Sequence, residues 1–219
     1  LAEKVGIEVP RVELIEVGDI GNLPDGLEQI GPLAFLIQRF DRSESGAVHI
    51  EDFAQVFDVY PADKYKKASC RNLLSVIASE SGDDDVAEFI RRLTFNVLIG
   101  NGDMHLKNWS LIYRDRRQAR LSPAYDFLST LPYIPNDQSA LRFSRTKDFS
   151  GYTYDELDHL ASRASVPRKL VIDTAAETVE RFMELWPAEK GNLPLDRRVV
   201  EAVDEHLRNL PLVADGYRN

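Results

Sequence analysis

The feature that most constrains the fold of this 219-residue chain is a helical pattern that ends at a polar loop. Five apolar residues follow the i, i+3, i+4, i+7 spacing of a buried helix face: Val86, Phe89, Ile90, Leu93 and Val97. The pattern predicts a helix over residues 86–99, which the acidic segment 81–85 opens and Gly100 ends. The loop that follows, residues 101–110, is then free to present polar side chains.

That loop carries two residues at an informative distance. Asp103 and Asn108 are five positions apart. Metal-assisted phosphoryl transfer needs a carboxylate that accepts or orients a hydroxyl proton, and oxygen ligands for Mg²⁺. The catalytic loop of kinases uses the same spacing, Asp-x-x-x-x-Asn, in which the Asp is the base and the Asn binds the metal. The sequence therefore predicts Asp103 as the base and Asn108 as a Mg²⁺ ligand.

Three further residues complete the predicted site. Asp126 precedes Phe127, so it can occupy the place of the metal-binding Asp that begins the Asp-Phe-Gly element. Lys107 lies between base and metal ligand, where it could neutralise transition-state charge, although it could equally pair with the base. His105 could be a general acid or a metal ligand, but a structural or orienting role is favoured. One histidine without spaced partners argues against zinc.

Each of these elements alone has a simpler structural interpretation. An Asp in a glycine-containing loop is more often a turn former than a base. The combination of a strong helix, the Asp103–Asn108 spacing and a later Asp-Phe pair favours the catalytic interpretation. Trp109 and Phe127 are expected to pack beneath the site.

Composition excludes several classes of protein. The formal charge of −9 argues against a nucleic-acid backbone as the main partner of this chain. No apolar run is long enough to span a bilayer, and the first residues lack a signal-peptide pattern. Cys70 is the single cysteine, so no internal disulfide can form, and a cytoplasmic protein is expected.

The start of the chain predicts a small antiparallel sheet. Residues 1–6 resemble the end of a helix closed by glycine. Residues 9–17 alternate apolar and charged side chains, as a half-buried strand does, and residues 33–40 are nearly continuously apolar. The second run predicts a strand buried on both faces and paired antiparallel with the first. Because a lone hairpin is marginal in water, the rest of that sheet should lie elsewhere.

The remainder predicts a mainly helical, α+β fold. Helical spacing is expected over residues 50–60, 70–80, 154–164, 168–185 and 196–209. Pro61 and a lysine-rich connector separate the first two helices, and Pro167 and the segment 187–194 break the last three. Residues 109–114 and 119–121 predict a short hairpin directly after the catalytic loop.

The chain resembles the HipA family of bacterial serine/threonine kinase toxins. The resemblance rests on residues 38–42 (Gln-Arg-Phe-Asp-Arg), 49–55, 96–110 and 121–129, and extends more weakly through 147–149 and the C-terminal helices. It implies a helical, protein-kinase-like C-lobe over residues 43–219, joined to a partial N-lobe and hinge over residues 1–42.

The resemblance also implies roles for individual residues. The hinge backbone from Gln38 to Phe40 would hold the adenine of ATP, and Asp41 would approach the ribose. Gln38 stands where an acidic residue is expected in the family. The implied activity is transfer of the γ-phosphoryl group to a serine or threonine of a protein, by family analogy an aminoacyl-tRNA synthetase. A DNA-binding antitoxin is the implied partner.

The main departure from the family is an absence in these 219 residues. They contain no Gly-rich phosphate loop and no strand lysine paired with a helix glutamate. A fragment or truncated homologue is therefore favoured over a split kinase with a separate N-terminal subdomain. The chain alone would grip the triphosphate from one side only, so isolated activity is not expected.

Two other functions stay open on the sequence. Small-molecule kinases of the aminoglycoside and choline type also carry Gly-Asp-x-x-x-x-Asn, but usually with His before the Gly, where this chain has Asn101. The other alternative is an inactive remnant that binds only a nucleotide or a partner protein.

Overall fold

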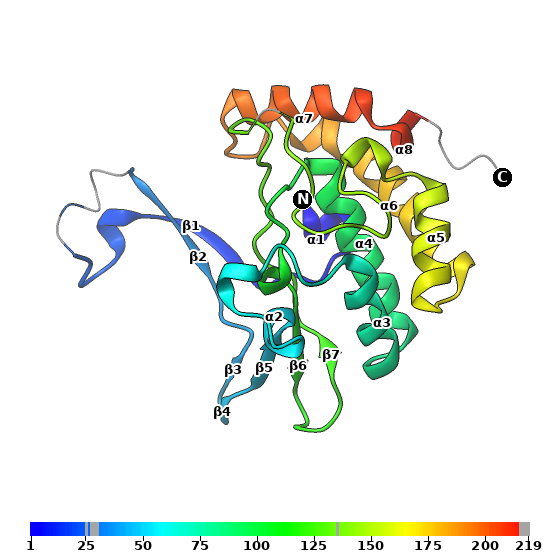
Figure 1. The fold of residues 1–219 in the computed structure, drawn as a ribbon. Coiled ribbons are helices and arrows are strands. Elements are labelled where there is room, and N and C mark those ends of the chain that lie inside the picture. Colours follow the sequence, from blue (N-terminus) through cyan, green and yellow to red (C-terminus); the bar gives the residue numbers. More distant parts are fainter. Residues whose placement is uncertain (25, 27–30, 135, 215–219) are drawn as a thin grey trace.

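The computed structural model describes residues 1–24, 26, 31–134 and 136–214. Helices form the body of the protein, and a long two-stranded hairpin projects to one side of it (Figure 1). The fold is therefore mainly helical with small sheets, which is the α+β class that the sequence predicts. None of the helices among these described residues is long and apolar enough to cross a membrane.

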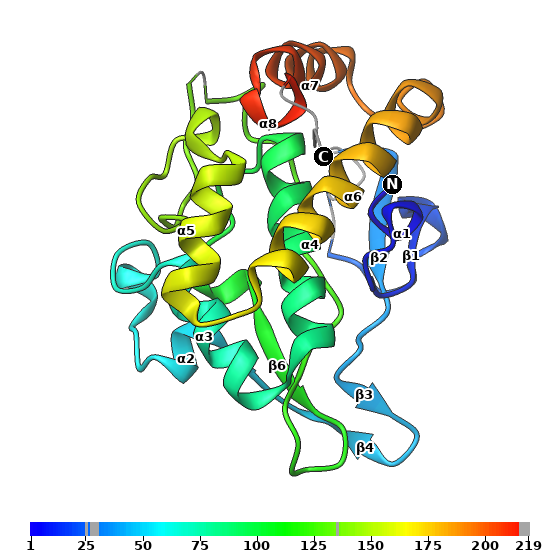
Figure 2. The same ribbon diagram turned by 90° about the vertical axis from the view of Figure 1, so that its right-hand side faces the viewer.

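Helix α4 (Asp83–Ile99) is the centre of the helical body. It packs against α3 (Cys70–Glu80), α6 (Arg168–Glu189) and α7 (Arg197–Asn209), and Figure 2 shows α6 crossing it. The apolar residues that predicted this helix are fully buried. Each such side chain contributes about 1.5–3 kcal/mol by leaving water, so packing holds α4 in place.

The C-terminal helices follow the predicted bounds closely. Helix α5 (Tyr154–Ala164) and α7 match the predicted segments 154–164 and 196–209, and the short α8 (Pro211–Ala214) follows them. The side chain of Thr153 caps α5 and that of Asp196 caps α7, each by accepting from a backbone N–H of the first turn.

Helix α6 differs from its prediction, because it continues through Pro187 where a break was expected. The Trp186 indole and the Lys190 ammonium both donate to Asp204 of α7, at 2.7 and 2.6 Å. These two contacts hold the last turn against α7 even though the proline has no N–H to donate.

The prediction of a helix over residues 50–60 is wrong. Strand β5 (His49–Asp52) occupies its start and pairs antiparallel with β6 (Ser110–Tyr113), which pairs in turn with β7 (Arg120–Leu121). Only α2 (Phe53–Val56) is helical, and a capping box on Asp52 opens it. Local apolar spacing cannot reveal a strand partner about 60 residues away along the chain. The predicted hairpin is confirmed as β6 and β7.

The projecting hairpin is formed by β1 (Val12–Glu16) and β2 (Leu33–Ile37), which pair antiparallel as predicted. The expected burial of β2 on both faces is wrong: Phe35 is 61% exposed and Leu33 is 52% exposed. Within the part of the chain that the structure describes, β1 and β2 form a two-stranded sheet with no further strand to cover them.

Short elements connect these parts. They are α1 (Ala2–Val5), η1 (Val17–Asp19), β3 (Arg42–Ser43), β4 (Gly46–Ala47), η3 (Pro61–Asp63), η4 (Leu106–Asn108) and η5 (Phe149–Gly151). As predicted, α1 ends at a glycine in the left-handed region, Gly6, with φ 96°.

Candidate active site

The loop after α4 is held in shape by one buried asparagine. Gly100 ends the helix in the left-handed region, with φ 66°. Asn101, which is 1% exposed, donates from Nδ2 to Asn96 Oδ1 at 2.8 Å and accepts at Oδ1 from the Asp103 N–H at 3.0 Å. The backbone that carries the predicted base is therefore fastened to the last turns of α4.

Gly102 lies where this loop touches the segment after Asp126. Its N–H donates to Thr130 Oγ1 at 2.9 Å, and Thr130 Oγ1 lies 2.5 Å from Asp137 Oδ2. A Cβ on Gly102 would lie 1.9 Å from that carboxylate oxygen and 2.9 Å from the Gln138 carbonyl oxygen. The close approach leaves room for a glycine and for no larger residue without movement.

The Gly102→Ala variant is therefore expected to be destabilised and to lose activity. Pushing Asp137 aside should cost about 1–3 kcal/mol of unfolding free energy, and the shifted loop should misplace Asp103. Denaturant unfolding and a phosphoryl-transfer assay measure the two effects. Gly191→Ala is the matched control, because no atom lies within 4 Å of the Cβ position there. Equal stability of the two variants would contradict the prediction.

The predicted metal ligands Asn108 and Asp126 lie side by side. Asn108 Nδ2 donates to Asp126 Oδ2 at 2.5 Å. The β6–β7 hairpin separates them in sequence and returns the chain to the loop, where the Tyr125 hydroxyl lies 2.9 Å from the Lys107 carbonyl oxygen and 2.5 Å from Ser110 Oγ. Asp126 has φ 64°, a conformation that Asp tolerates better than most residues.

The chemistry of this pair fits Mg²⁺. The ion prefers oxygen ligands and is commonly held by one or two carboxylates or amides together with water and substrate phosphates. Asp126 offers two carboxylate oxygens, and Asn108 offers an amide oxygen once its side chain turns. Among the described residues no group of three or more His, Cys, Asp and Glu gathers.

Two residues from a distant segment contact the predicted catalytic loop, residues 101–110. The Tyr65 hydroxyl donates to Asp103 Oδ1 at 2.7 Å, and Lys64 Nζ lies 2.6 Å from His105 Nε2. Burial, and then the Lys64 ammonium, lower the pKa of His105 below its ordinary value. A neutral ring that accepts from Lys64 favours an orienting role for His105 over that of a general acid.

Neither Tyr65 nor Lys64 carries a sequence signal that marks it as part of the site. Both lie in what the sequence marks only as a lysine-rich connector, and 38 positions separate Tyr65 from Asp103. No spacing signal could have found them, because their contacts arise from the fold. Lys107, by contrast, is exposed, and no hydrogen bond or ion pair of its ammonium group occurs within the described residues.

The predicted hinge residues already have partners within the protein. Phe40 stacks on Tyr125, with ring centroids 5.8 Å apart. Gln38 is exposed and continues the pairing of β1 and β2 by donating from its N–H to the Arg11 carbonyl at 2.9 Å. Phe40 therefore lies against the residue before Asp126, whereas Gln38 belongs to the base of the β1–β2 hairpin.

Asp41, the residue expected to approach the ribose, is 7% exposed and already paired. Arg39 donates to its two carboxylate oxygens at 2.8 and 2.6 Å, and Arg42 donates at 2.6 Å. The Arg39 hydrogen bonds hold the pKa of Asp41 below its usual value. A ribose hydroxyl would have to share this carboxylate with two guanidinium groups.

An open cleft of about 590 Å³ lies between α1, the β1–β2 hairpin and the segment 124–128. Its lining is mainly apolar and includes Leu1, Val9, Val12, Phe35 and Ile37. Two acidic residues, Glu3 and Asp126, also line it, and Asp126 belongs to the predicted metal site. Ligand sites of this size usually combine apolar walls with a few polar groups. A cleft of this size and lining can hold an aromatic ring beside the Asp126 carboxylate.

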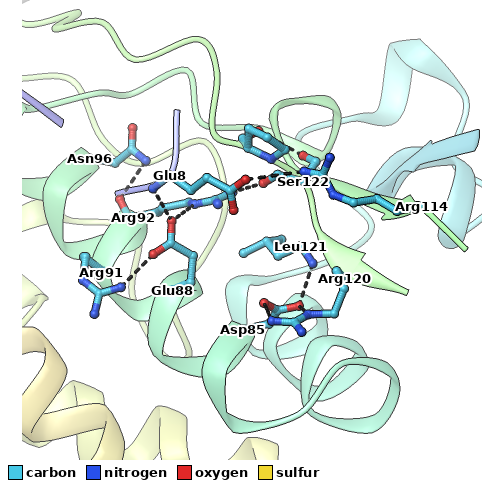
Figure 3. Close-up of polar contacts among 11 residues, drawn as sticks. Glu8, Asp85, Glu88, Arg91, Arg92, Asn96, Arg114, Arg120, Leu121 and Ser122 are labelled. Carbon is cyan, nitrogen blue, oxygen red and sulfur yellow. Dashed lines mark hydrogen bonds and ion pairs between the residues drawn. The ribbon is translucent and has the colours of Figure 1, made fainter. Parts of the chain in front are cut away.

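A buried arginine on α4, together with Glu88, joins this helix to the segment before β1 and to the segment after β7 (Figure 3). Arg92 is 3% exposed and donates to Glu88 Oε1 at 2.7 Å and to the Ser122 carbonyl at 2.6 Å. Glu88 also accepts from the Glu8 N–H at 3.1 Å. One ion pair therefore fastens the segment before β1 and the segment before Asp126 to the same helix turn.

A second ion pair lies one turn earlier on α4 (Figure 3). Asp85, which is 6% exposed, accepts from Arg120 at 3.0 and 3.1 Å and from the Leu121 N–H at 2.7 Å. The backbone contact secures the edge of β7, so the strand that leads to Asp126 is held by α4 at two points.

The family model of the HipA-like C-terminal domain matches residues 1–186. The chain belongs to this family. The match covers the helix α4, the catalytic loop and the cleft, so the resemblance identified in the four sequence motifs is confirmed.

Among relatives, the chain is 54% identical over 213 residues to the protein named "Putative kinase Y4dM" of Sinorhizobium fredii. The matched region is 97% of this chain and 52% of that protein. The chain therefore spans about half the length of this relative.

Two solved structures share the fold. HipA of Shewanella oneidensis MR-1, in complex with HipB and its operator DNA, matches with a TM-score of 0.75 and 21% identity over 97% of this chain and 52% of that chain. The proinflammatory kinase CtkA of Helicobacter pylori matches with a TM-score of 0.63 and 16% identity, over 97% of this chain and 77% of that chain. Both likenesses support a kinase-like C-lobe.

Proposed function

We propose that this region is the catalytic half of a HipA-like serine/threonine protein kinase that transfers the γ-phosphoryl group of ATP to a protein hydroxyl. One observation carries the proposal. Asn108 and Asp126 are in contact where the loop after α4 meets the segment after β7, and Asp126 also lines the adjacent cleft. Asp103 lies on the same loop as Asn108, five positions before it. A base, two metal ligands and a ring-sized cleft are the parts that phosphoryl transfer from a nucleotide requires.

Each residue has a distinct role in this proposal. Asp103 accepts the proton of the attacking hydroxyl, and its loop is fixed by Asn101 so that the carboxylate is in place before substrate binds. Asn108 and Asp126 hold Mg²⁺, which neutralises charge on the transferring phosphate oxygens. Lys107, exposed beside these groups, adds positive charge near the phosphates. The segment from Gln38 to Asp41 borders the nucleotide.

The rest of the N-lobe would complete the grip on the triphosphate. Phe35, Leu36 and Ile37 of β2 are each more than 40% exposed. Further strands laid on these faces, from the same polypeptide or from a separate N-terminal subdomain, would cover them and supply the missing phosphate contacts. The proposed activity therefore belongs to the assembled kinase rather than to residues 1–219 alone.

The proposed partners follow the family. HipA of Shewanella oneidensis was solved with HipB and operator DNA, and a DNA-binding antitoxin is the partner proposed for this protein. The net charge of −9 fits a chain that does not itself bind the DNA backbone, because backbone binding relies on clustered Lys and Arg. In the proposal the partner makes those contacts. A protein substrate such as an aminoacyl-tRNA synthetase and a cytoplasmic location complete the proposal.

Radiolabel transfer tests the proposed reaction. The full gene product is incubated with γ-labelled ATP and Mg²⁺, once with a cell lysate and once with a panel of small alcohols and amino sugars. Label on a protein serine or threonine is the expected result. Label on a small molecule would replace the proposal with a small-molecule kinase. Nucleotide binding without any transfer would indicate an inactive remnant.

Asp126→Asn is expected to weaken nucleotide binding in Mg²⁺ more than binding without metal. The substitution keeps the shape of the side chain but removes the charge that holds the cation, and each lost charged contact costs about 1.5–3 kcal/mol, roughly 10- to 100-fold in affinity. Calorimetric titration with an ATP analogue, with Mg²⁺ and with a chelator, measures both affinities. Equal losses in the two titrations would point to packing in the cleft instead.

A further inference from the structure

A segment far from the catalytic loop in sequence lies across it. We call residues 62–67 the crossing segment. It makes three contacts with the loop: Tyr65 OH with Asp103 Oδ1 at 2.7 Å, Lys64 Nζ with His105 Nε2 at 2.6 Å, and the Lys64 carbonyl with the Leu106 N–H at 3.5 Å. Two side chains and one backbone group therefore bind the two segments together.

The crossing segment is fastened on its other side as well. Lys147 Nζ donates to the Ala140 carbonyl at 2.6 Å and reaches the Tyr65 carbonyl at 3.5 Å. The Tyr65 ring meets the His105 ring edge-on, with centroids 5.3 Å apart. Tyr65, which is 38% exposed, therefore has a ring contact and a backbone contact in addition to its hydrogen bond to Asp103.

The hydroxyl is suited to hold one carboxylate oxygen and leave the other free. Burial, and then the Asp103 carboxylate, raise the pKa of Tyr65 to about 12, so the phenol stays protonated and remains a donor at neutral pH. Within residues 1–24, 26, 31–134 and 136–214, Tyr65 is the only group that donates a hydrogen bond to this carboxylate. Oδ2 is then available to accept a substrate proton.

We propose that Tyr65 is a positioning residue for the base: its hydroxyl holds Oδ1 of Asp103 and aims Oδ2 at the attacking hydroxyl. The inference rests on the proposed function, because it takes Asp103 as the base. A carboxylate on a loop can rotate about its Cβ–Cγ bond, and one fixed oxygen restricts that rotation before substrate binds. The opposite effect, in which the phenol blocks the base, predicts a change in rate of the opposite sign.

Tyr65→Phe in the full gene product tests the proposal. The variant keeps the ring that meets His105 and removes only the hydroxyl. We expect kcat for phosphoryl transfer to fall about 10- to 100-fold, the effect of a misaligned catalytic group, while KM for ATP and the unfolding midpoint stay within error. A purely structural role would lower the unfolding midpoint or raise KM instead. Tyr60→Phe, whose side chain is 75% exposed in the same region, is the matched control and should be unchanged.

Asp103→Asn measured in parallel separates this inference from the proposed function. Loss of transfer in Asp103→Asn with wild-type kcat in Tyr65→Phe would overturn the positioning role alone. A faster Tyr65→Phe would also overturn it and indicate a blocking contact. Wild-type kcat in Asp103→Asn would overturn both, because the base would then lie elsewhere. A loss in both variants, with unchanged KM in Tyr65→Phe, supports the inference.

Discussion

Asp103→Asn in the full gene product is expected to abolish phosphoryl transfer and to leave the fold intact. General-base catalysis contributes about 10²- to 10⁴-fold, and an amide cannot accept the proton, so a loss of about 10³-fold is expected. The amide has nearly the shape of the carboxylate. Its oxygen can still accept from Tyr65, and Asn101 still holds the Asp103 backbone N–H.

Steady-state transfer of labelled phosphate measures this loss, and circular dichroism with thermal unfolding checks the fold. Asp58→Asn is the matched control. Asp58 is exposed and has φ 51°, a conformation that Asn adopts readily, so the same chemical change there should alter neither rate nor stability. Transfer at the wild-type rate in Asp103→Asn would remove this residue from its role.

The largest loss of stability is expected from Arg92→Met. The variant keeps most of the buried aliphatic volume but leaves Glu88 without its buried partner and the Ser122 carbonyl without its donor. Breaking a buried ion pair costs about 3–5 kcal/mol when the remaining charge is left unpaired. Because Arg91 still binds Glu88 at 2.7 Å, a loss of about 3 kcal/mol, at the low end of this range, is expected. Since Glu88 also accepts from the Glu8 N–H, the junction between α4 and the segment before β1 should loosen in the same step.

Denaturant unfolding measures the loss of unfolding free energy. Two further variants test whether the buried pair of Arg92 and Glu88 causes it. Arg91→Met removes the neighbouring arginine, which binds the same Glu88 at 2.7 Å but has a side chain 20% exposed against 4% for Arg92, so a smaller loss is expected. Glu88→Gln combined with Arg92→Met removes the carboxylate charge that has lost its buried partner and should recover part of the stability. Equal losses in the Arg91 and Arg92 variants would mean that the buried pair is not the cause.

The candidate site could be predicted from the sequence where its chemistry is local. Asp103 and Asn108 lie on one loop at the end of one amphipathic helix, and both the helix and the spacing can be read without knowing any distant contact. Asp126 needed only a short hairpin to return the chain to that loop. The proximity of Asn108 and Asp126, at 2.5 Å, agrees with that interpretation.

Contacts that span long stretches of the chain escaped prediction. Strand β5 carries helical spacing, yet it forms a strand because β6 supplies its hydrogen bonds from about 60 positions away. Strand β2 has the apolar run of a buried strand, but burial requires a covering surface, and the described residues provide none for Phe35. The side chains of a strand indicate which residues it could bury, but they do not indicate whether another part of the chain covers them.

The sequence by itself determined the helix α4, the loop after it and the residue types that phosphoryl transfer requires, because each depends on neighbours a few positions apart. The tertiary structure alone decided which groups surround these residues. It set Lys64 beside His105, 41 positions away, and it brought the Tyr65 hydroxyl to the Asp103 carboxylate, 38 positions away. The physical reason is that hydrogen-bond partners and burial are properties of the packed chain, and no local pattern records which distant segment will supply them.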